Sequence, residues 1–115
     1  SRHVEVFVDG VQLADTKRPV LVFETSLPVR YYIPQEDIHM ELLEPTRATS
    51  RCPYKGLASY WSVAAAGETR RNLVWGYMDP LPEMPRIKGL LSFYNEKVDI
   101  YVDGELEQRP ETAWS

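Results

Sequence analysis

Residues 4–10 read VEVFVDG, and this stretch predicts a β-hairpin near the start of the chain. Valine fills every second position from 4 to 8, a period of two that is typical of a strand with one buried face. Asp9-Gly10 follows at once, and this pair is preferred in type I′ turns because both central residues take positive φ. The stretch therefore indicates a strand that reverses into a second, antiparallel strand.

The turn also predicts a register for this hairpin. Folding back across it sets Val8 opposite Val11 and Val6 opposite Leu13. One face of the hairpin would then be apolar throughout, which specifies the pairing well, because a slip of one residue would turn that face outward.

A near copy of the stretch, VDIYVDG, occupies residues 98–104. Its Asp-Gly pair predicts a second hairpin, with Val102 opposite Glu105 and Ile100 opposite Glu107. A solenoid needs several copies at a short fixed period, so we interpret the two copies as two hairpins that share one local solution.

Other runs rich in β-branched and aromatic residues predict further strands. They are 19–25 (PVLVFET), 29–33 (VRYYI), 56–67 (GLASYWSVAAAG) and 70–77 (RRNLVWGY), the last two joined through Gly67 and GETRR. Residues 90–94 and 98–102 are expected to pair as a hairpin around the loop NEK. The three prolines in 78–89 predict an ordered loop with one helical turn, since proline does not fit a sheet interior.

Residues 34–45, PQEDIHMELLEP, suit either of two structures. Gln, Glu, Met and Leu favour a helix, and Pro34 fits a first helical turn. Ile38, Met40 and Leu42 alternate with polar residues, which favours a strand, and Pro45 is expected to close the segment in both cases.

With eight or nine strands, we expect a single all-β domain over residues 1–115. The expected architecture is a compact, mostly antiparallel β sandwich or barrel-like fold with little helix. Residues 110–115 are expected to fray.

Composition narrows the function classes. The chain has 17 acidic and 13 basic residues, a net charge of −4, which argues against nucleic acid as a partner. No apolar run approaches the ~20 residues that span a bilayer, so no membrane partner is expected. A single cysteine forms no internal disulfide, which fits the cytoplasm. This cysteine and the two histidines match no metal-site spacing, so neither metal nor cofactor is expected.

The single cysteine, Cys52, lies in the segment CPYKG and is the candidate reactive group. A reactive cysteine is a thiolate, which needs a nearby cation. Pro53 and Gly56 suit a turn that would carry Lys55 back over the sulfur, and His39 is the candidate base. The alternative is structural, because free cysteine often packs like a small apolar residue.

Aromatic residues are numerous, and core packing accounts for most aromatic side chains on strands. Those with hydroxyls in a cleft beside Lys55 would instead line a pocket with apolar walls and a few polar groups. The candidate ligand-binding residues are Tyr32, Tyr60, Trp75, Tyr77 and Tyr94.

Three strings together resemble one bacterial family. They are YYIPQEDIHMELLEPT (31–46), CPYKGLASYW (52–61) and VWGYMDPLPEMPRIKGLLSFYNEKVDIYVDG (74–104). In this order they are similar to the family catalogued as domain of unknown function 427, over roughly residues 4–104. The resemblance implies a compact antiparallel β fold, similar in topology to a zinc-containing Rab exchange factor whose zinc cysteines are missing here. It also favours the strand interpretation of residues 38–44, after a PQED turn.

The family carries a nucleotidyltransferase-like label, but the residues offer little for that chemistry. Nucleotidyl transfer uses divalent cations held by neighbouring carboxylates. The two Asp-Gly pairs are explained as turns, Glu36-Asp37 is one weak acidic pair, and the spacing of a phosphate-binding loop is missing.

Three functions stay open at this point. The first is binding of a small anionic or aromatic ligand in a pocket lined by cysteine, lysine and tyrosine, with enzymatic activity through Cys52 as an extension. The second is a non-catalytic interaction module, most simply a homodimer formed through an edge strand or hairpin. The third is the nucleotidyl transfer of the family label.

Overall fold

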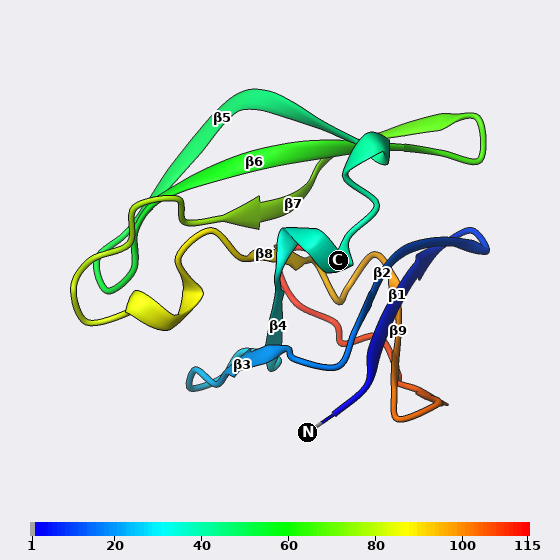
Figure 1. Ribbon diagram of the computed structural model, residues 1–115, viewed down its shortest axis with the longest axis horizontal. Coiled ribbons are helices and arrows are strands. Elements are labelled where there is room, and N and C mark those ends of the chain that lie inside the picture. The colour runs from blue at the N-terminus through cyan, green and yellow to red at the C-terminus, as the bar shows by residue number, and fades with distance from the viewer. Residues whose placement is uncertain (1) are drawn as a thin grey trace.

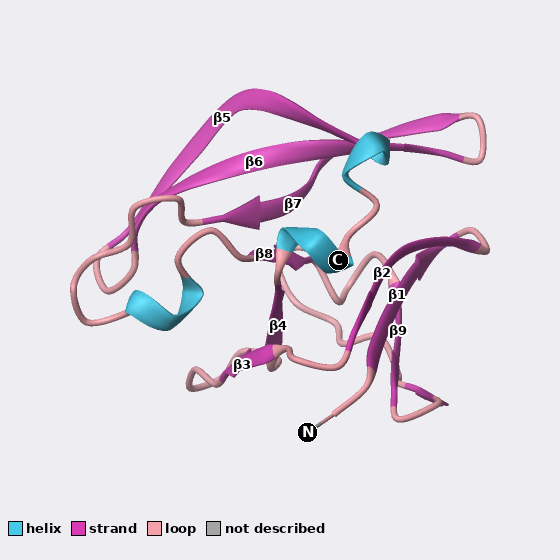
Figure 2. Cartoon of the chain, viewed as in Figure 1, coloured by secondary structure: helices cyan, strands magenta, loops and turns pink. Residues whose placement is uncertain are grey.

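The computed structural model describes residues 2–115 and shows the predicted all-β class: two antiparallel sheets with short 3₁₀ turns between strands (Figures 1 and 2). The strands are β1 (Val4–Val8), β2 (Val11–Thr16), β3 (Val20–Val22), β4 (Arg30–Ile33), β5 (Leu43–Cys52), β6 (Gly56–Ala65), β7 (Glu68–Gly76), β8 (Leu91–Phe93), β9 (Asp99–Val102) and β10 (Glu105–Leu106). The 3₁₀ turns are η1 (Gln35–Asp37), η2 (Met40–Leu42) and η3 (Pro85–Ile87). In the described residues, no helix is long and apolar enough to cross a membrane.

The smaller sheet contains both Asp-Gly hairpins side by side, in the order β10-β9-β1-β2. Asp9 and Asp103 take φ of 47° and 51°, and the glycines after them 78° and 84°, as a type I′ turn requires. The two similar stretches, β1 and β9, pair with each other, with Val6 opposite Ile100. The two stretches thus form the central pair of one sheet.

A β-bulge corrects the predicted register of the first hairpin. Val8 lies opposite Val11 as predicted, but Val6 lies opposite Ala14, not Leu13. The register shifts between Val6 and Phe7, so β2 carries one extra residue there. Leu13 and Ala14 are both fully buried, because the bulge turns two successive side chains into the core.

The larger sheet has the order β3-β4-β8-β7-β6-β5, and it overturns two sequence predictions. Strand β8 pairs with β4 and β7, whereas β9 belongs to the other sheet, so residues 90–102 are a crossing between sheets and not a hairpin. Pro45 does not close its segment either: β5 continues through it to Cys52 on the sheet edge, where proline is tolerated.

Residues 34–42 form two 3₁₀ turns, which corrects the strand predicted for 38–44. Ile38 makes only an isolated bridge to Ala14, and Met40–Leu42 is η2. The strand begins at Leu43. The loop at 78–89 agrees with its prediction, since its one helical turn is η3.

The central strands of the larger sheet, such as β4 and β8, are buried on both faces, which creates two apolar regions. Valines of β1 pack between the sheets against side chains such as Ile33 and Phe93. On the outer face of the larger sheet, Tyr32 and Trp75 form a second cluster with Ile87 from the 78–89 loop. Along β4, Tyr31 and Ile33 face the first region and Tyr32 faces the second, as strand alternation dictates.

Candidate functional site

The second cluster, here called the aromatic cluster, collects six of the candidate residues at one place. Its buried members are Tyr32, Ala58, Trp75, Tyr77 and Ile87, and Cys52, Tyr60 and Tyr94 are among the half-buried residues packed against it. The structure thus brings together Cys52 and all five predicted ligand-binding aromatics. They come from β4, β5, β6, the end of β7 and the residue after β8.

The rings of this cluster form a continuous series, here called the aromatic ladder. Tyr32 and Trp75 meet edge to face at 6.3 Å between centroids, and the Trp75 indole N–H donates to the Tyr32 hydroxyl at 3.1 Å. Trp75 and Tyr94 lie 4.4 Å apart, and Trp114 stacks on Tyr94 at 6.4 Å with 27° between the planes. Such aromatic pairs stabilise by about 0.5–1.5 kcal/mol each beyond the area they bury.

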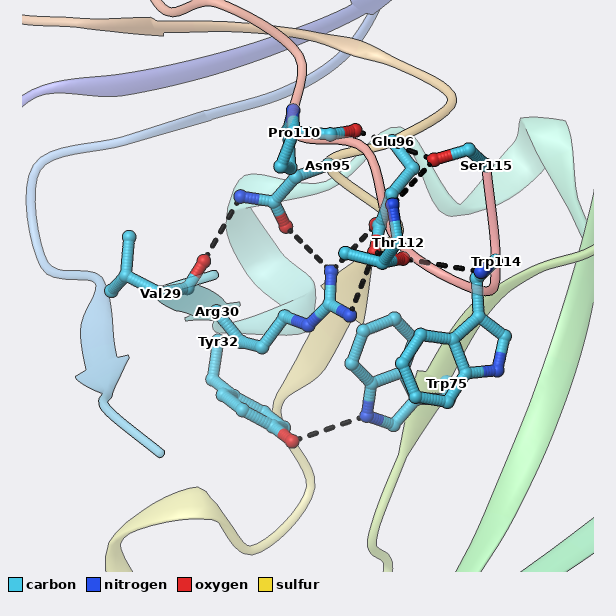
Figure 3. A network of polar contacts seen from close by, with 10 residues as sticks. All are labelled: Val29, Arg30, Tyr32, Trp75, Asn95, Glu96, Pro110, Thr112, Trp114 and Ser115. Atoms are coloured by element: carbon cyan, nitrogen blue, oxygen red, sulfur yellow. Dashed lines mark hydrogen bonds and ion pairs between the residues drawn. The ribbon is translucent and has the colours of Figure 1, made fainter. Parts of the chain in front are cut away.

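A buried ion pair supports the ladder (Figure 3). Arg30 donates to both carboxylate oxygens of Glu96, at 2.7 and 3.1 Å, and to Asn95 at 3.2 Å. Both charged side chains are nearly inaccessible, with 7% and 0% exposed. The guanidinium carbon lies 5.2 Å from the Trp75 ring centre and 5.6 Å from that of Tyr94. Sequence reasoning missed this pair, because its members are 66 residues apart.

The ion pair decides the protonation of Glu96. Burial raises the pKa of that carboxyl, but hydrogen bonds from Arg30 and Thr112 outweigh burial and hold the pKa below its usual range. Glu96 is therefore a carboxylate at neutral pH, and Arg30 carries the compensating charge.

Three tyrosine hydroxyls of the cluster, those of Tyr32, Tyr77 and Tyr94, remain protonated near neutrality. Burial raises the pKa of Tyr32 to about 12. Burial also raises the pKa of Tyr77, with the neighbouring Tyr32 and Cys52 adding to the effect. The pKa of Tyr94 is raised by burial and then by the hydroxyl of Tyr60. These groups can therefore donate hydrogen bonds and do not act as bases near neutrality.

Tyr77 has a polar tip without a partner. The residue is 6% exposed, and its hydroxyl, which is not itself fully buried, makes no hydrogen bond within residues 2–115. Ser92, on the strand between Tyr32 and Trp75, has a fully buried hydroxyl that also lacks a partner. Unpaired buried polar groups are rare and costly, and each calls for a functional or structural reason.

Lys55 has a charged partner that was not predicted. The side chain is buried, and its ammonium forms an ion pair with the carboxylate of Glu24, in the loop after β3. No hydrogen bond joins Lys55 to Cys52 in the described residues. The turn between β5 and β6 is held by a hydrogen bond from the Leu81 N–H to the Lys55 carbonyl, at 2.9 Å.

His39 lies elsewhere. Its ring is 3.4 Å from the Gln12 amide oxygen and 3.7 Å from Glu41, and its backbone N–H donates to Leu13 of the smaller sheet. These contacts place His39 beside β2, and the structure does not bring it to Cys52. The predicted trio of Cys52, Lys55 and His39 is therefore not assembled.

One group outside the cluster has donors that suit a cation. Ligand atoms of His3, Glu5 and Asp15 lie within 4.8 Å of one another. His3 and Asp15 already contact each other at 2.6 Å, and Gln12 donates to Glu5, so the side chains satisfy one another.

The fold and the cluster define a small antiparallel β domain with an aromatic site on the outer face of its larger sheet. The family model described as domain of unknown function (DUF427) matches residues 1–104, so the chain belongs to that family. No curated protein matches the chain.

Proposed function

We propose that the domain binds a small planar ligand in the aromatic cluster, at the side formed by Cys52, Tyr60 and Tyr77. The observation that carries this proposal is the unpartnered hydroxyl of Tyr77, at the tip of a side chain that packs in one cluster with Cys52 and Tyr32. A ligand acceptor would satisfy that hydroxyl, while the neighbouring rings would supply the apolar walls typical of small-molecule sites.

The charges around the cluster favour an aromatic ligand over an anionic one. Lys55 is engaged by Glu24, and Arg30 is engaged by Glu96. Each buried cation thus has its own carboxylate, and an anion would have to compete with it. The ligand class that fits is a neutral planar molecule with one hydrogen-bond acceptor.

The same pairings bear on the catalytic alternatives. Lys55, the cation predicted to activate Cys52, forms an ion pair with Glu24. In the proposed site the Cys52 thiol therefore lines the pocket, and its alkylation reports whether a ligand is bound. Nucleotidyl transfer gains no support from the cluster, because Glu24 and Glu96 each face a basic side chain instead of each other.

Alkylation of Cys52 tests the binding proposal. Planar neutral fragments that raise the melting temperature are expected to slow iodoacetamide modification of Cys52, because they would lie against the sulfur. Tyr77→Phe removes the unpaired donor and is expected to weaken binding about fivefold.

The matched control is Tyr101→Phe, because Tyr101 lies on β9 of the other sheet and packs on Phe7. The proposed site would be contradicted if Tyr77→Phe bound the fragments as tightly as wild type, or if bound fragments left the rate of Cys52 alkylation unchanged.

A second candidate function, self-association, is favoured by one exposed surface. Phe23 and Tyr54 are 75% and 76% exposed. The ion pair between Glu24 and Lys55 joins the loops that carry them, β3–β4 and β5–β6, and both loops lie at the same end of the molecule (Figure 1). Exposed apolar patches of this kind mark interaction sites.

Light scattering after size-exclusion chromatography tests this candidate. If two copies associate through this end, the wild type will give a dimer mass at high micromolar concentration, and the double variant Phe23→Ser/Tyr54→Ser will give a monomer mass. The control is Leu106→Ser, which removes another exposed apolar side chain, on β10 of the smaller sheet. A monomeric wild type would rule the candidate out.

A further inference from the structure

The segment 110–115 folds back over the aromatic ladder, although it was expected to fray. Thr112 donates to the Glu96 carboxylate at 2.6 Å, and the Trp114 N–H donates to the Thr112 hydroxyl at 3.1 Å. These two bonds, drawn in Figure 3, place the Trp114 ring on Tyr94, and the ring centre lies 5.9 Å from the Arg30 guanidinium carbon. The segment therefore supplies the outermost ring of the ladder from beyond the family-matched residues 1–104.

Few contacts hold this outermost ring. Within residues 2–115, the Thr112–Glu96 bond is the one hydrogen bond that joins segment 110–115 to the rest of the chain. The other bonds of the segment are internal to it. Trp114 is 45% exposed, whereas Trp75, two rings further in, is 7% exposed. Weakly tied elements of this kind open at low free-energy cost.

The surface under Trp114 is built, in contrast, from firmly held groups. Tyr94 is anchored against Trp75, and Arg30 is fixed by its fork on Glu96 and by Asn95. A ring stacked on Tyr94 there also meets the Arg30 guanidinium, which attracts the electron-rich face of an aromatic system. An indole already occupies the place, so the geometry is shown to accept a planar bicyclic ring.

From this arrangement we infer that the outer face of Tyr94, beside Arg30, is a subsite for an electron-rich planar ring, and that Trp114 is its intramolecular occupant. A ligand bound there displaces Trp114 and continues the ladder with its own ring. The inference rests on the proposed function, since it extends the aromatic site to the Tyr94 face and names the ring class that it takes. The exchange is non-covalent, so no group is transferred.

Free indole is the probe that tests the displacement. Because Trp114 competes for the same face, wild type should bind indole at least tenfold more weakly than the full-length variant Trp114→Ala. The measurements are two-dimensional NMR titration, with the Tyr94 ring signals as reporter, and the indole-dependent rise of the melting temperature. In wild type, a rise in Trp114 side-chain mobility on saturation with indole is also expected.

Two controls define the result. Trp114→Ala/Tyr94→Ala removes the platform and should lose the gain in affinity. Tyr54→Ala, which deletes a more exposed ring in the turn between β5 and β6, should bind indole like wild type. Equal binding by wild type and Trp114→Ala, or gained binding that survives loss of Tyr94, would overturn the inference.

The same titrations separate this inference from the proposed function. If indole binds Trp114→Ala through Tyr94 but never slows alkylation of Cys52, the Tyr94 subsite stands and the Cys52 site fails. If planar fragments protect Cys52 but indole binds wild type and Trp114→Ala equally, the proposed function stands and the displacement of Trp114 is wrong.

Discussion

Replacing Arg30 by methionine is expected to lower the free energy of unfolding by about 3–5 kcal/mol. Methionine fills much of the same space, but it leaves the Glu96 carboxylate buried without its counter-ion. Losing one partner of a buried pair is costly, because the remaining charge keeps its desolvation penalty and loses the compensating attraction. Urea unfolding followed by tryptophan fluorescence measures the change.

Two further proteins show whether the loss comes from the pair. Arg30→Met/Glu96→Gln removes both charges and should recover a large part of the stability. Arg18→Met breaks a pair with Glu36 and Asp37 in which Arg18 is 62% exposed, so it should leave the midpoint almost unchanged. A loss in Arg30→Met no larger than in Arg18→Met would contradict the role given to the buried pair.

Acidification is expected to remove the stability that the ion pair between Arg30 and Glu96 contributes. Because the pKa of Glu96 is lowered in the folded protein, its contribution is complete above the pKa of an unfolded glutamate and is lost as the pH falls through the folded value. Between neutrality and strongly acidic pH, wild type should therefore lose more stability than Arg30→Met/Glu96→Gln does. Parallel pH curves for the two proteins would contradict this assignment.

Trp75→Ala is the second change with a large expected effect, a loss of about 3–5 kcal/mol. Trp75 is buried and contacts Tyr32, Tyr94 and Arg30 at the centre of the ladder. Its removal therefore leaves a cavity and takes a packing partner from all three side chains. Trp75→Phe keeps one ring but leaves the Tyr32 hydroxyl without its donor, and about 1–3 kcal/mol is expected. Thermal and urea unfolding give both values.

Trp114→Ala is the matched comparison, because it removes the same side chain from the exposed end of the ladder. A small loss is expected there, since Trp114 is 45% exposed. If Trp75→Ala cost no more than Trp114→Ala, the inner ladder would not be the packed structure described above.

Local features of the fold could be predicted from sequence, because they depend on neighbouring residues. Asp9-Gly10 and Asp103-Gly104 specify type I′ turns by their own backbone preferences, and both turns form. The bulge at Leu13 could not be anticipated, since Leu13 and Ala14 both suit the core and only the facing sheet decides between registers. The polar, exposed side chains of β5 carry no alternation, which is why that edge strand was missed.

The candidate site was predictable in its composition and not in its pairings. Aromatic residues on alternating strand positions were expected to gather, and Tyr32, Trp75 and Tyr77 do lie together. The partner of Lys55 is Glu24, 31 residues away, and no pattern around Lys55 points to it. The closeness of Lys55 to Cys52 in the sequence therefore did not indicate that Lys55 pairs with Glu24 in the folded protein.

The central pairing of β1 with β9 has a consequence for how the protein is made. Val4–Val8 is synthesised well before its partner Asp99–Val102, because the two strands lie far apart in the sequence. Until β9 has been made, the edge of β1 that faces it has no hydrogen-bonding partner, and contacts of such long sequence separation form slowly. Two growing chains on one messenger could pair at that edge before either is finished, so aggregation during synthesis, more than instability afterwards, is the hazard this topology carries.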